Sequence, residues 1–135
     1  MGYVHYYLGI EVTQHPKSIF LSQKKYIGDL LNRFGMTECN PLSTPMEKNL
    51  KLTSIEGKEF EDATKYRQLV GSLIYLTTTR PNISFVVGIL SRFMQKPCEG
   101  HWSAARKVLK YLKGTQGYGI KYTRVDYFRL IGYSD

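Results

Sequence analysis

The sequence predicts a mixed α/β fold of the α+β kind: an N-terminal β-hairpin, a mainly helical middle and a two-stranded C-terminal segment. Three observations support this prediction. Runs rich in β-branched and aromatic residues occupy positions 6–22, apolar residues recur at helical spacing between positions 23 and 113, and an alternating pattern returns from Tyr118. With 135 residues, 42% of them hydrophobic, the chain is long enough for one domain with a core.

The N-terminal hairpin is predicted from two β-rich runs. Residues 6–12 and 18–22 form the expected strands, and residues 13–17 supply a polar turn that contains a proline. Gly9 lies inside the first strand. There it predicts either a bulge or the close approach of another backbone.

The first helix is predicted over residues 23–34, with Ser22 as its N-cap and Gly35 just after its end. The stretch that follows, residues 36–62, is predicted to be a long surface loop. Its prolines bias the preceding residues away from helical geometry, and its last part is a solvated acidic run.

Three more helices are predicted from apolar residues at helical spacing, separated by proline- and glycine-bearing breaks. Asp62 is the expected cap of the first of them, and Gly114 is the expected end of the last. Their ranges are 63–77, 83–94 and 101–113.

The C-terminal segment alternates like a β-strand. Residues 118–122 are one expected strand, and residues 127–134 are its expected partner. Because Asp135 falls directly inside this pattern, the chain is expected to be a fragment of something longer.

The net charge of +8 is distributed unevenly. Residues 1–62 hold 7 Lys and Arg against 8 Asp and Glu, whereas residues 63–135 hold 12 against 3. This one-sided charge favours a polyanionic partner, because each neutralised phosphate releases condensed counterions. No membrane-length apolar run and no targeting signal is visible, so an intracellular location, cytoplasmic or nuclear, is expected, with Cys39 and Cys98 reduced.

The residue groups that most enzyme chemistries need are not apparent. The three histidines lie far apart, and no phosphate-binding loop or nucleophile motif is present. The carboxylates outside the acidic run are isolated, although two-metal phosphoryl transfer needs several in one site. The sequence therefore predicts no complete catalytic centre and no cofactor for this chain.

Basic residues on or beside the later helices are the candidate binding site. Arg106 and Lys110, and then Lys110 and Lys113, share one side of a helix, and such a row can follow a phosphate backbone without reading sequence. The alternative is a solvated face without a partner. Aromatic residues such as Tyr66, Tyr75 and Trp102 are interpreted as core rather than as base-stacking groups. The full set of candidate basic residues is Arg80, Arg92, Lys96, Arg106, Lys107, Lys110 and Lys113.

Five sequence blocks in a fixed order resemble a known family. They occupy residues 8–12, 19–26, 43–46, 66–115 and 132–135. In order and spacing these blocks are similar to the C-terminal part of the reverse transcriptase in Pol polyproteins of copia-type LTR retrotransposons. The last block, Gly-Tyr-Ser-Asp, is similar to the start of the linked ribonuclease H.

The resemblance implies a role for each segment. Residues 1–22 resemble the primer-grip hairpin at the edge of the polymerase palm, and residues 23–96 resemble the helices of the thumb, with the long loop inside them. Residues 97–126 resemble the connection, and residues 127–135 the first strand of ribonuclease H. The residues at the centre of the primer grip are Leu8, Gly9 and Ile10.

The function implied by the resemblance is to hold a template–primer duplex, RNA–DNA or DNA, without sequence preference. The parent enzyme would be an RNA-directed DNA polymerase with ribonuclease H that uses Mg²⁺, and the partners would include its palm and nuclease. Asp135 matches the first metal-binding carboxylate of that nuclease, but the Tyr-x-Asp-Asp turn of the polymerase does not occur here. We expect the chain alone to be inactive in both reactions. Two alternatives stay open, a decayed transposon remnant without function and a helical protein-interaction module.

Overall fold

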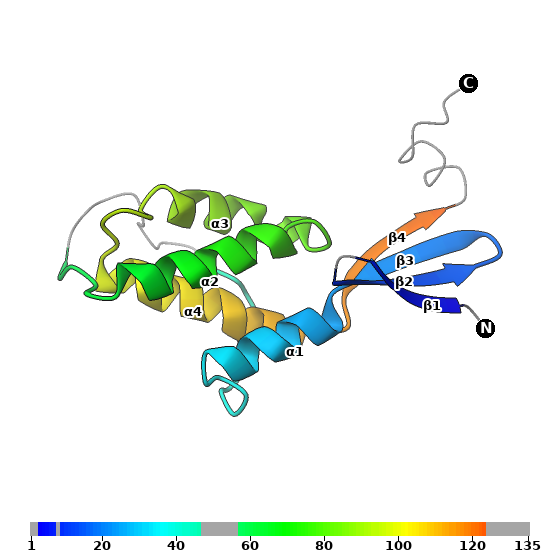
Figure 1. The fold of residues 1–135 in the computed structure, drawn as a ribbon, viewed down its shortest axis with the longest axis horizontal. Coiled ribbons are helices and arrows are strands. Elements are labelled where there is room, and N and C mark those ends of the chain that lie inside the picture. The colour runs from blue at the N-terminus through cyan, green and yellow to red at the C-terminus, as the bar shows by residue number, and fades with distance from the viewer. Residues whose placement is uncertain (1–2, 8, 47–56, 124–135) are drawn as a thin grey trace, which may run out of the picture.

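The computed structural model describes residues 3–7, 9–46 and 57–123, and it shows a small sheet beside a block of helices (Figure 1). This arrangement confirms the predicted mixed α/β fold with a hairpin at its N-terminal end. The elements in chain order are β1 (Tyr3–Tyr7), β2 (Ile10–His15), β3 (Ser18–Ser22), α1 (Lys24–Arg33), α2 (Ala63–Leu76), the 3-10 helix η1 (Pro81–Ile83), α3 (Ser84–Ser91), α4 (Glu99–Gly114) and β4 (Gly119–Thr123).

The sheet has the order β1-β2-β3-β4, and all neighbouring strands are antiparallel. The turn between β2 and β3 lies within the predicted turn at residues 13–17, but it is shorter, because β2 continues to His15, which pairs with Ser18 across it. After all the helices the chain returns as β4, in which Ile120 lies opposite Leu21 of β3. Both ends of the described chain therefore contribute to one sheet. The strand expected at residues 127–134 lies outside the described residues.

The prediction of one continuous first strand was wrong. Residues 6–12 do not form a single strand, because β1 ends at Tyr7 and β2 begins at Ile10. Gly9 has φ +82° in the turn between them. Because Tyr7 pairs with Ile10 across the antiparallel strands β1 and β2, Gly9 lies in a turn rather than in a bulge, and glycine adopts this positive φ without steric cost.

The ends of the helices correct one of the predicted caps. Ser22 is the last residue of β3, and its hydroxyl donates to Glu11 Oε2 (3.4 Å), so Gln23 is the N-cap of α1 instead. Gly114 is the last residue of α4, as the sequence predicted, and Thr115 is its C-cap. The predicted cap of α2 is also confirmed, since Asp62 accepts a hydrogen bond from the first turn of that helix at 3.0 Å.

The third and fourth helices differ in length from the prediction. α3 ends at Ser91 rather than at residue 94, and α4 begins at Glu99 rather than at residue 101. The earlier start of α4 has a local cause. The backbone N–H of Cys98 donates to His101 Nδ1 (2.9 Å), while the Cys98 side chain accepts from the backbone of His101. This reciprocal pair satisfies two groups that a helix start leaves unpaired.

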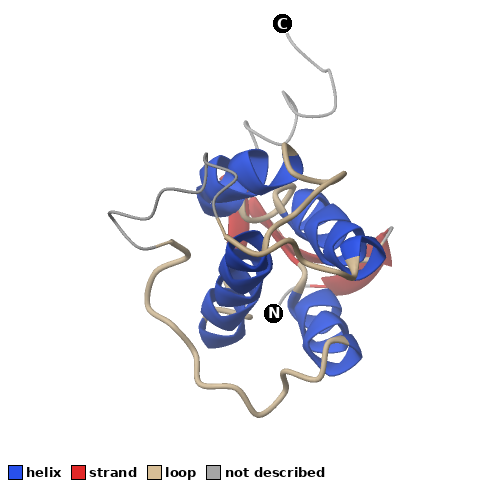
Figure 2. Cartoon of the chain, turned by 90° about the vertical axis from the view of Figure 1, so that its left-hand side faces the viewer, coloured by secondary structure: helices blue, strands red, loops and turns tan. Residues whose placement is uncertain are grey.

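The core lies between the four α-helices, and the strands stand behind this block in Figure 2. Tyr66 and the leucines of α2 and α4 are fully buried within it. Ile74 of α2 lies outside this core and is 45% exposed. α4 shares this core with α1, α2 and α3. In the described parts of the chain, no helix combines the length and apolar character that a membrane span requires.

Candidate nucleic-acid interface

The predicted basic row lies on α4, and only part of it faces solvent. Arg106 is exposed, while Lys107 and Lys110 are half-buried. Their apolar neighbours on the opposite side of the helix, Val108 and Leu109, are fully buried. The amphipathic pattern therefore placed the helix faces correctly, but it did not show how much of the charged face other segments cover.

Lys113 at the end of the row is held by the loop that follows α1. Its Nζ donates to the carbonyl oxygens of Thr37 and Cys39, both at 2.5 Å. Next to it, Pro41 approaches Gly114 so closely that a Cβ at Gly114 would lie 3.0 Å from the Pro41 Cβ. Gly114 therefore permits this close approach at the end of the helix, and much of the hydrogen-bonding capacity of Lys113 is satisfied within the chain.

Arg80 is not part of the exposed basic row, because it is only 2% exposed. Its guanidinium donates to the carbonyl oxygen of Thr115 (2.9 Å) and to the Thr115 hydroxyl (2.6 Å). The rings of Tyr111 and Tyr118 lie 5.6 and 5.7 Å from the guanidinium carbon. Burial lowers the pKa of Arg80, and Tyr111 partly opposes this effect. Arg80 ties the turn after α2 to the junction of α4 and β4.

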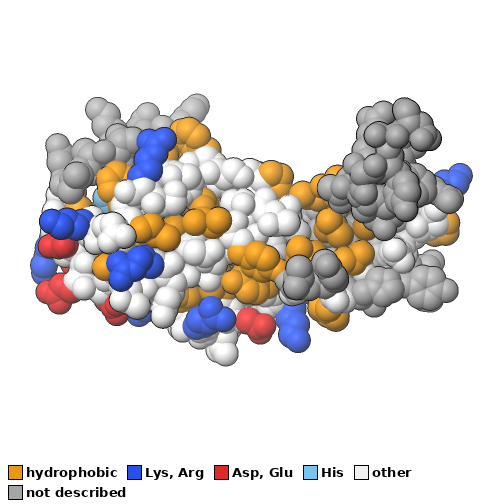
Figure 3. All heavy atoms as spheres, turned by 45° about the horizontal axis from the view of Figure 1, so that its top comes forward, with side chains coloured by type: hydrophobic (Ala, Val, Ile, Leu, Met, Phe, Trp, Pro, Cys, Tyr) orange, Lys and Arg blue, Asp and Glu red, His pale blue; other side chains and the backbone are white. Residues whose placement is uncertain are grey.

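Arg92 and Lys96 are both exposed, at the end of α3 and in the loop before α4. On the face shown in Figure 3, Lys and Arg side chains lie mainly over the helical part, with acidic side chains among them, and the centre of that face is largely apolar and uncharged. Arg92, Lys96 and Arg106 are thus the predicted basic residues that the structure leaves exposed.

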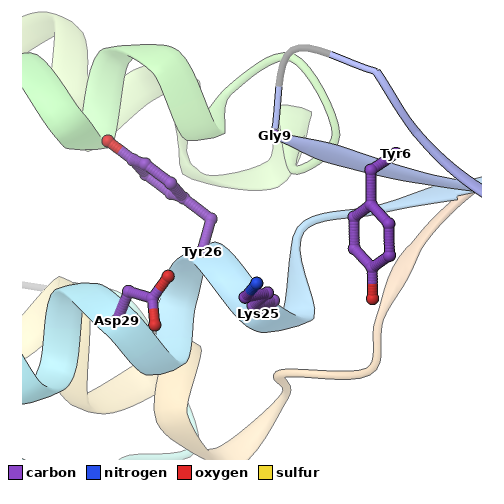
Figure 4. Close-up of a pocket in the computed structure, with 5 residues that line it drawn as sticks. All are labelled: Tyr6, Gly9, Lys25, Tyr26 and Asp29. Atoms are coloured by element: carbon purple, nitrogen blue, oxygen red, sulfur yellow. The ribbon is translucent and has the colours of Figure 1, made fainter.

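Gly9, one of the hairpin residues predicted to contact nucleic acid, lies beside a hollow of about 250 Å³ between the β1–β2 turn and α1. Figure 4 shows Tyr6 extending from β1 and Tyr26 projecting from α1, with Lys25 between them. Asp29 lies one helical turn after Lys25, and Gly9 completes the lining.

The lining of this hollow combines charge with an aromatic surface. The Nζ of Lys25 lies 5.7 Å from the centre of the Tyr6 ring, and that ring is 61% exposed. Sequence reasoning missed Lys25. Its position directly after the junction of β3 and α1 could have indicated that it lies near the hairpin. Of the three predicted hairpin residues, Gly9 is exposed and Ile10 half-buried, whereas Leu8 lies outside the described residues.

Two of the aromatic residues that the sequence assigned to the core make packing contacts in the structure. Tyr66 is fully buried, its hydroxyl donates to the carbonyl oxygen of Leu90 (2.6 Å), and burial raises its pKa. Trp102 stacks on Phe60 with ring centres 4.8 Å apart. These two contacts agree with the interpretation of Tyr66 and Trp102 as packing residues.

Within the described ranges, no group of three or more His, Cys, Asp or Glu side chains could hold a metal ion. Asp135, the predicted nuclease carboxylate, lies outside them. The exposed side chains of Arg92, Lys96 and Arg106 are positively charged groups that an anion can approach.

Residues 1–48 match the family described as reverse transcriptase (RNA-dependent DNA polymerase). No solved structure matches the chain.

Two plant transposon proteins are similar to almost the whole chain. The retrovirus-related Pol polyproteins from transposons RE2 and RE1 of Arabidopsis thaliana are 44% and 45% identical to it over 132 residues, which is 98% of the chain and 9% of each polyprotein. An uncharacterized mitochondrial protein of the same plant is 42% identical over 120 residues, covering 89% of the chain and 50% of that protein. Over nearly its whole length the chain is therefore similar to one segment of these Pol polyproteins, and its first 48 residues match the reverse transcriptase family. It spans about a tenth of the length of these two polyproteins.

Proposed function

We propose that this chain holds a template–primer duplex, RNA–DNA or DNA, for the RNA-directed DNA polymerase of a retrotransposon Pol polyprotein. The similarity to Pol polyproteins over 98% of the chain supports the class of activity. The observation that carries the binding role is the charge of the second half. Between residues 63 and 123 the sequence has ten Lys and Arg against one acidic residue, Glu99.

The structure distinguishes cations that stabilise the fold from cations that are available to a ligand. Arg80 and Lys113 donate to backbone carbonyl groups, and Arg67 donates to the carbonyl oxygen of Met94 (3.0 Å). Arg92, Lys96 and Arg106 are exposed, so they can approach phosphates without disturbing the core. Single cations on helices and loops contact phosphates and carry no sequence information.

Such binding is electrostatic, and it therefore weakens as salt concentration rises. We expect dissociation constants within roughly 10⁻⁴–10⁻⁶ M at physiological salt for any duplex of sufficient length. In the proposal, the remaining partners are the other parts of the polyprotein, which would supply the catalytic carboxylates and their Mg²⁺.

The test is fluorescence anisotropy of a labelled RNA–DNA hybrid, titrated with the chain at several salt concentrations. The double reversal Lys96→Glu and Arg106→Glu should abolish measurable binding, because it replaces two exposed cations with anions. The matched control is Lys17→Glu with Lys58→Glu, since both residues are exposed and the net charge changes equally.

Three outcomes of this titration would overturn the proposal. In the first, wild-type affinity does not depend on salt. In the second, both double variants lose affinity equally, which would mean that net charge alone acts. In the third, no duplex binds at all, which leaves the decayed remnant or the protein-interaction module.

A further inference from the structure

Tyr75, in the last turn of α2, contacts the turn between β1 and β2. If Gly9 carried a Cβ, that atom would lie 3.2 Å from the Tyr75 hydroxyl and 3.9 Å from its Cε2. Gly9 also has φ +82°, so this turn is fixed by its backbone conformation and by the tyrosine packed against it. Figure 4 shows Gly9, in the turn between β1 and β2, above α1.

Tyr75 is itself fixed within the helical block. Its ring meets the ring of Tyr26 edge-on, with centres 5.1 Å apart and planes at 77°. Tyr26 packs against the hydrophobic core from α1. Nearby, the hydroxyl of Thr79 donates to Gln23 Oε1 (2.6 Å) and joins the end of α2 to the start of α1. The position of the Tyr75 hydroxyl is therefore set by two helices.

Among the described residues, the sheet and the helical block touch at few other places. Helix-to-strand contacts are concentrated where α1 meets β2, and the sheet extends to one side of the helices in Figure 1. A contact at the hairpin turn therefore has a large effect on where that turn lies relative to the exposed cations of the helices.

The Tyr75 hydroxyl is buried, and it has no hydrogen-bond partner among the residues that the structure describes. An unpaired buried hydroxyl lowers stability, and phenylalanine would fill nearly the same space without that penalty. The ring packs against Tyr26, and the hydroxyl lies next to Gly9 in the β1–β2 turn.

We propose that Tyr75 is a positioning residue for nucleic-acid binding, because it holds the β1–β2 turn at a fixed height over α1. The turn then keeps the exposed Tyr6 ring beside Lys25 at the hollow, so that this ring and this cation can meet a duplex together. This inference rests on the proposed function, and it adds a residue that makes no contact with the nucleic acid itself.

The experiment uses the full chain and the anisotropy assay described above. Tyr75→Ala should weaken binding about tenfold, equivalent to about 1.4 kcal/mol. The dependence on salt should stay unchanged, because no cation is removed. The matched control is Ile74→Ala, the neighbouring residue on α2, which is 45% exposed and should bind like the wild type. Circular dichroism gives the folded fraction, and affinities are corrected for it, so a purely structural role of Tyr75 would leave the corrected affinity unchanged.

A double-mutant cycle keeps the inference testable if Tyr75→Ala does not fold. Gly9→Ala introduces the methyl group that meets the Tyr75 hydroxyl, and Tyr75→Phe removes that hydroxyl. Gly9→Ala should therefore weaken binding less in the Tyr75→Phe background than in the wild type. Its effect in the Ile74→Ala background should equal its effect in the wild type.

The outcomes separate this inference from the proposed function. If the wild type binds duplex with salt dependence, but Tyr75→Ala retains wild-type affinity or the cycle is additive, Tyr75 has no positioning role and the proposed function stands. If the wild type binds no duplex, the proposed function itself fails. A lower affinity of Tyr75→Ala with an unchanged salt dependence, together with a non-additive cycle, supports the inference.

Discussion

Arg80 offers the sharpest test of the structure, because the sequence assigns it to a binding surface and the structure places it in the interior. Arg80→Ala removes the donors to the Thr115 carbonyl and hydroxyl and leaves a buried space. A hydrogen bond to a charged group contributes about 1.5–3 kcal/mol, and truncating a large buried side chain to alanine costs about 2–5 kcal/mol. Relief from burying a charge offsets part of this loss. We expect a net destabilisation of about 3 kcal/mol.

Arg80→Met is the informative partner of this variant. Methionine keeps most of the side-chain volume and removes the buried charge, so the expected cost is smaller, about 1 kcal/mol. Urea unfolding followed by circular dichroism measures both variants, and comparable slopes would show that the midpoints report stability. A change within about 0.5 kcal/mol for Arg80→Ala, as is usual for exposed positions, would refute the buried placement.

The same variant tests the assignment to the interface. Because its guanidinium is turned inward, Arg80→Met should bind a duplex with wild-type salt dependence once the folded fraction is accounted for. A fall of about 0.9 in the salt slope is the effect of losing one phosphate contact. Such a fall would show that Arg80 reaches the nucleic acid after all.

Three further predictions concern single positions. Gly119→Ala should weaken the pairing of β3 with β4 by about 1–3 kcal/mol, because its Cβ would overlap the Leu21 carbonyl oxygen, whereas Gly117→Ala meets open space; hydrogen exchange of the strand amides compares the two. Burial raises the pKa of Tyr66 above its ordinary value of 10.0. The unfolded chain therefore ionises first, and the stability from this residue is complete below pH 10 and is lost above it; Tyr66→Phe should flatten the urea midpoint plotted against pH in that range. Asp62→Ala should cost about 1 kcal/mol by removing the cap of α2, whereas Asp62→Asn should cost less, as thermal unfolding can show.

Local sequence patterns were sufficient for most of the elements. Helical spacing of apolar residues located four helices, and the cap at Asp62 was readable because a side-chain acceptor precedes a periodic run. The break at Gly9 was not readable in the same way. Apolar residues continue on both sides of it, and only the antiparallel pairing of β1 with β2 distinguishes a turn from a bulge.

The candidate interface was less predictable, because exposure depends on segments that are distant in the sequence. Nothing near Lys113 indicates that Thr37 and Cys39 bind its ammonium group, since they precede it by more than 70 residues. No acidic residue next to Arg80 in the sequence indicates a buried ion pair. Its hydrogen-bond partners are instead a backbone carbonyl and a hydroxyl. Charge periodicity can identify the polar face of a helix, but it cannot show which part of that face another loop covers.

The contact between Phe60 and Trp102 has a spectroscopic consequence. The sequence has one tryptophan, and in the structure its indole lies between Phe60 and Phe34, with the Lys65 ammonium 5.4 Å from its ring. All intrinsic tryptophan emission of the chain therefore originates where the segment before α2 meets the start of α4. Undocking of that segment would expose the indole to water and shift its emission to longer wavelength, so the chain carries its own optical reporter of this junction without any label.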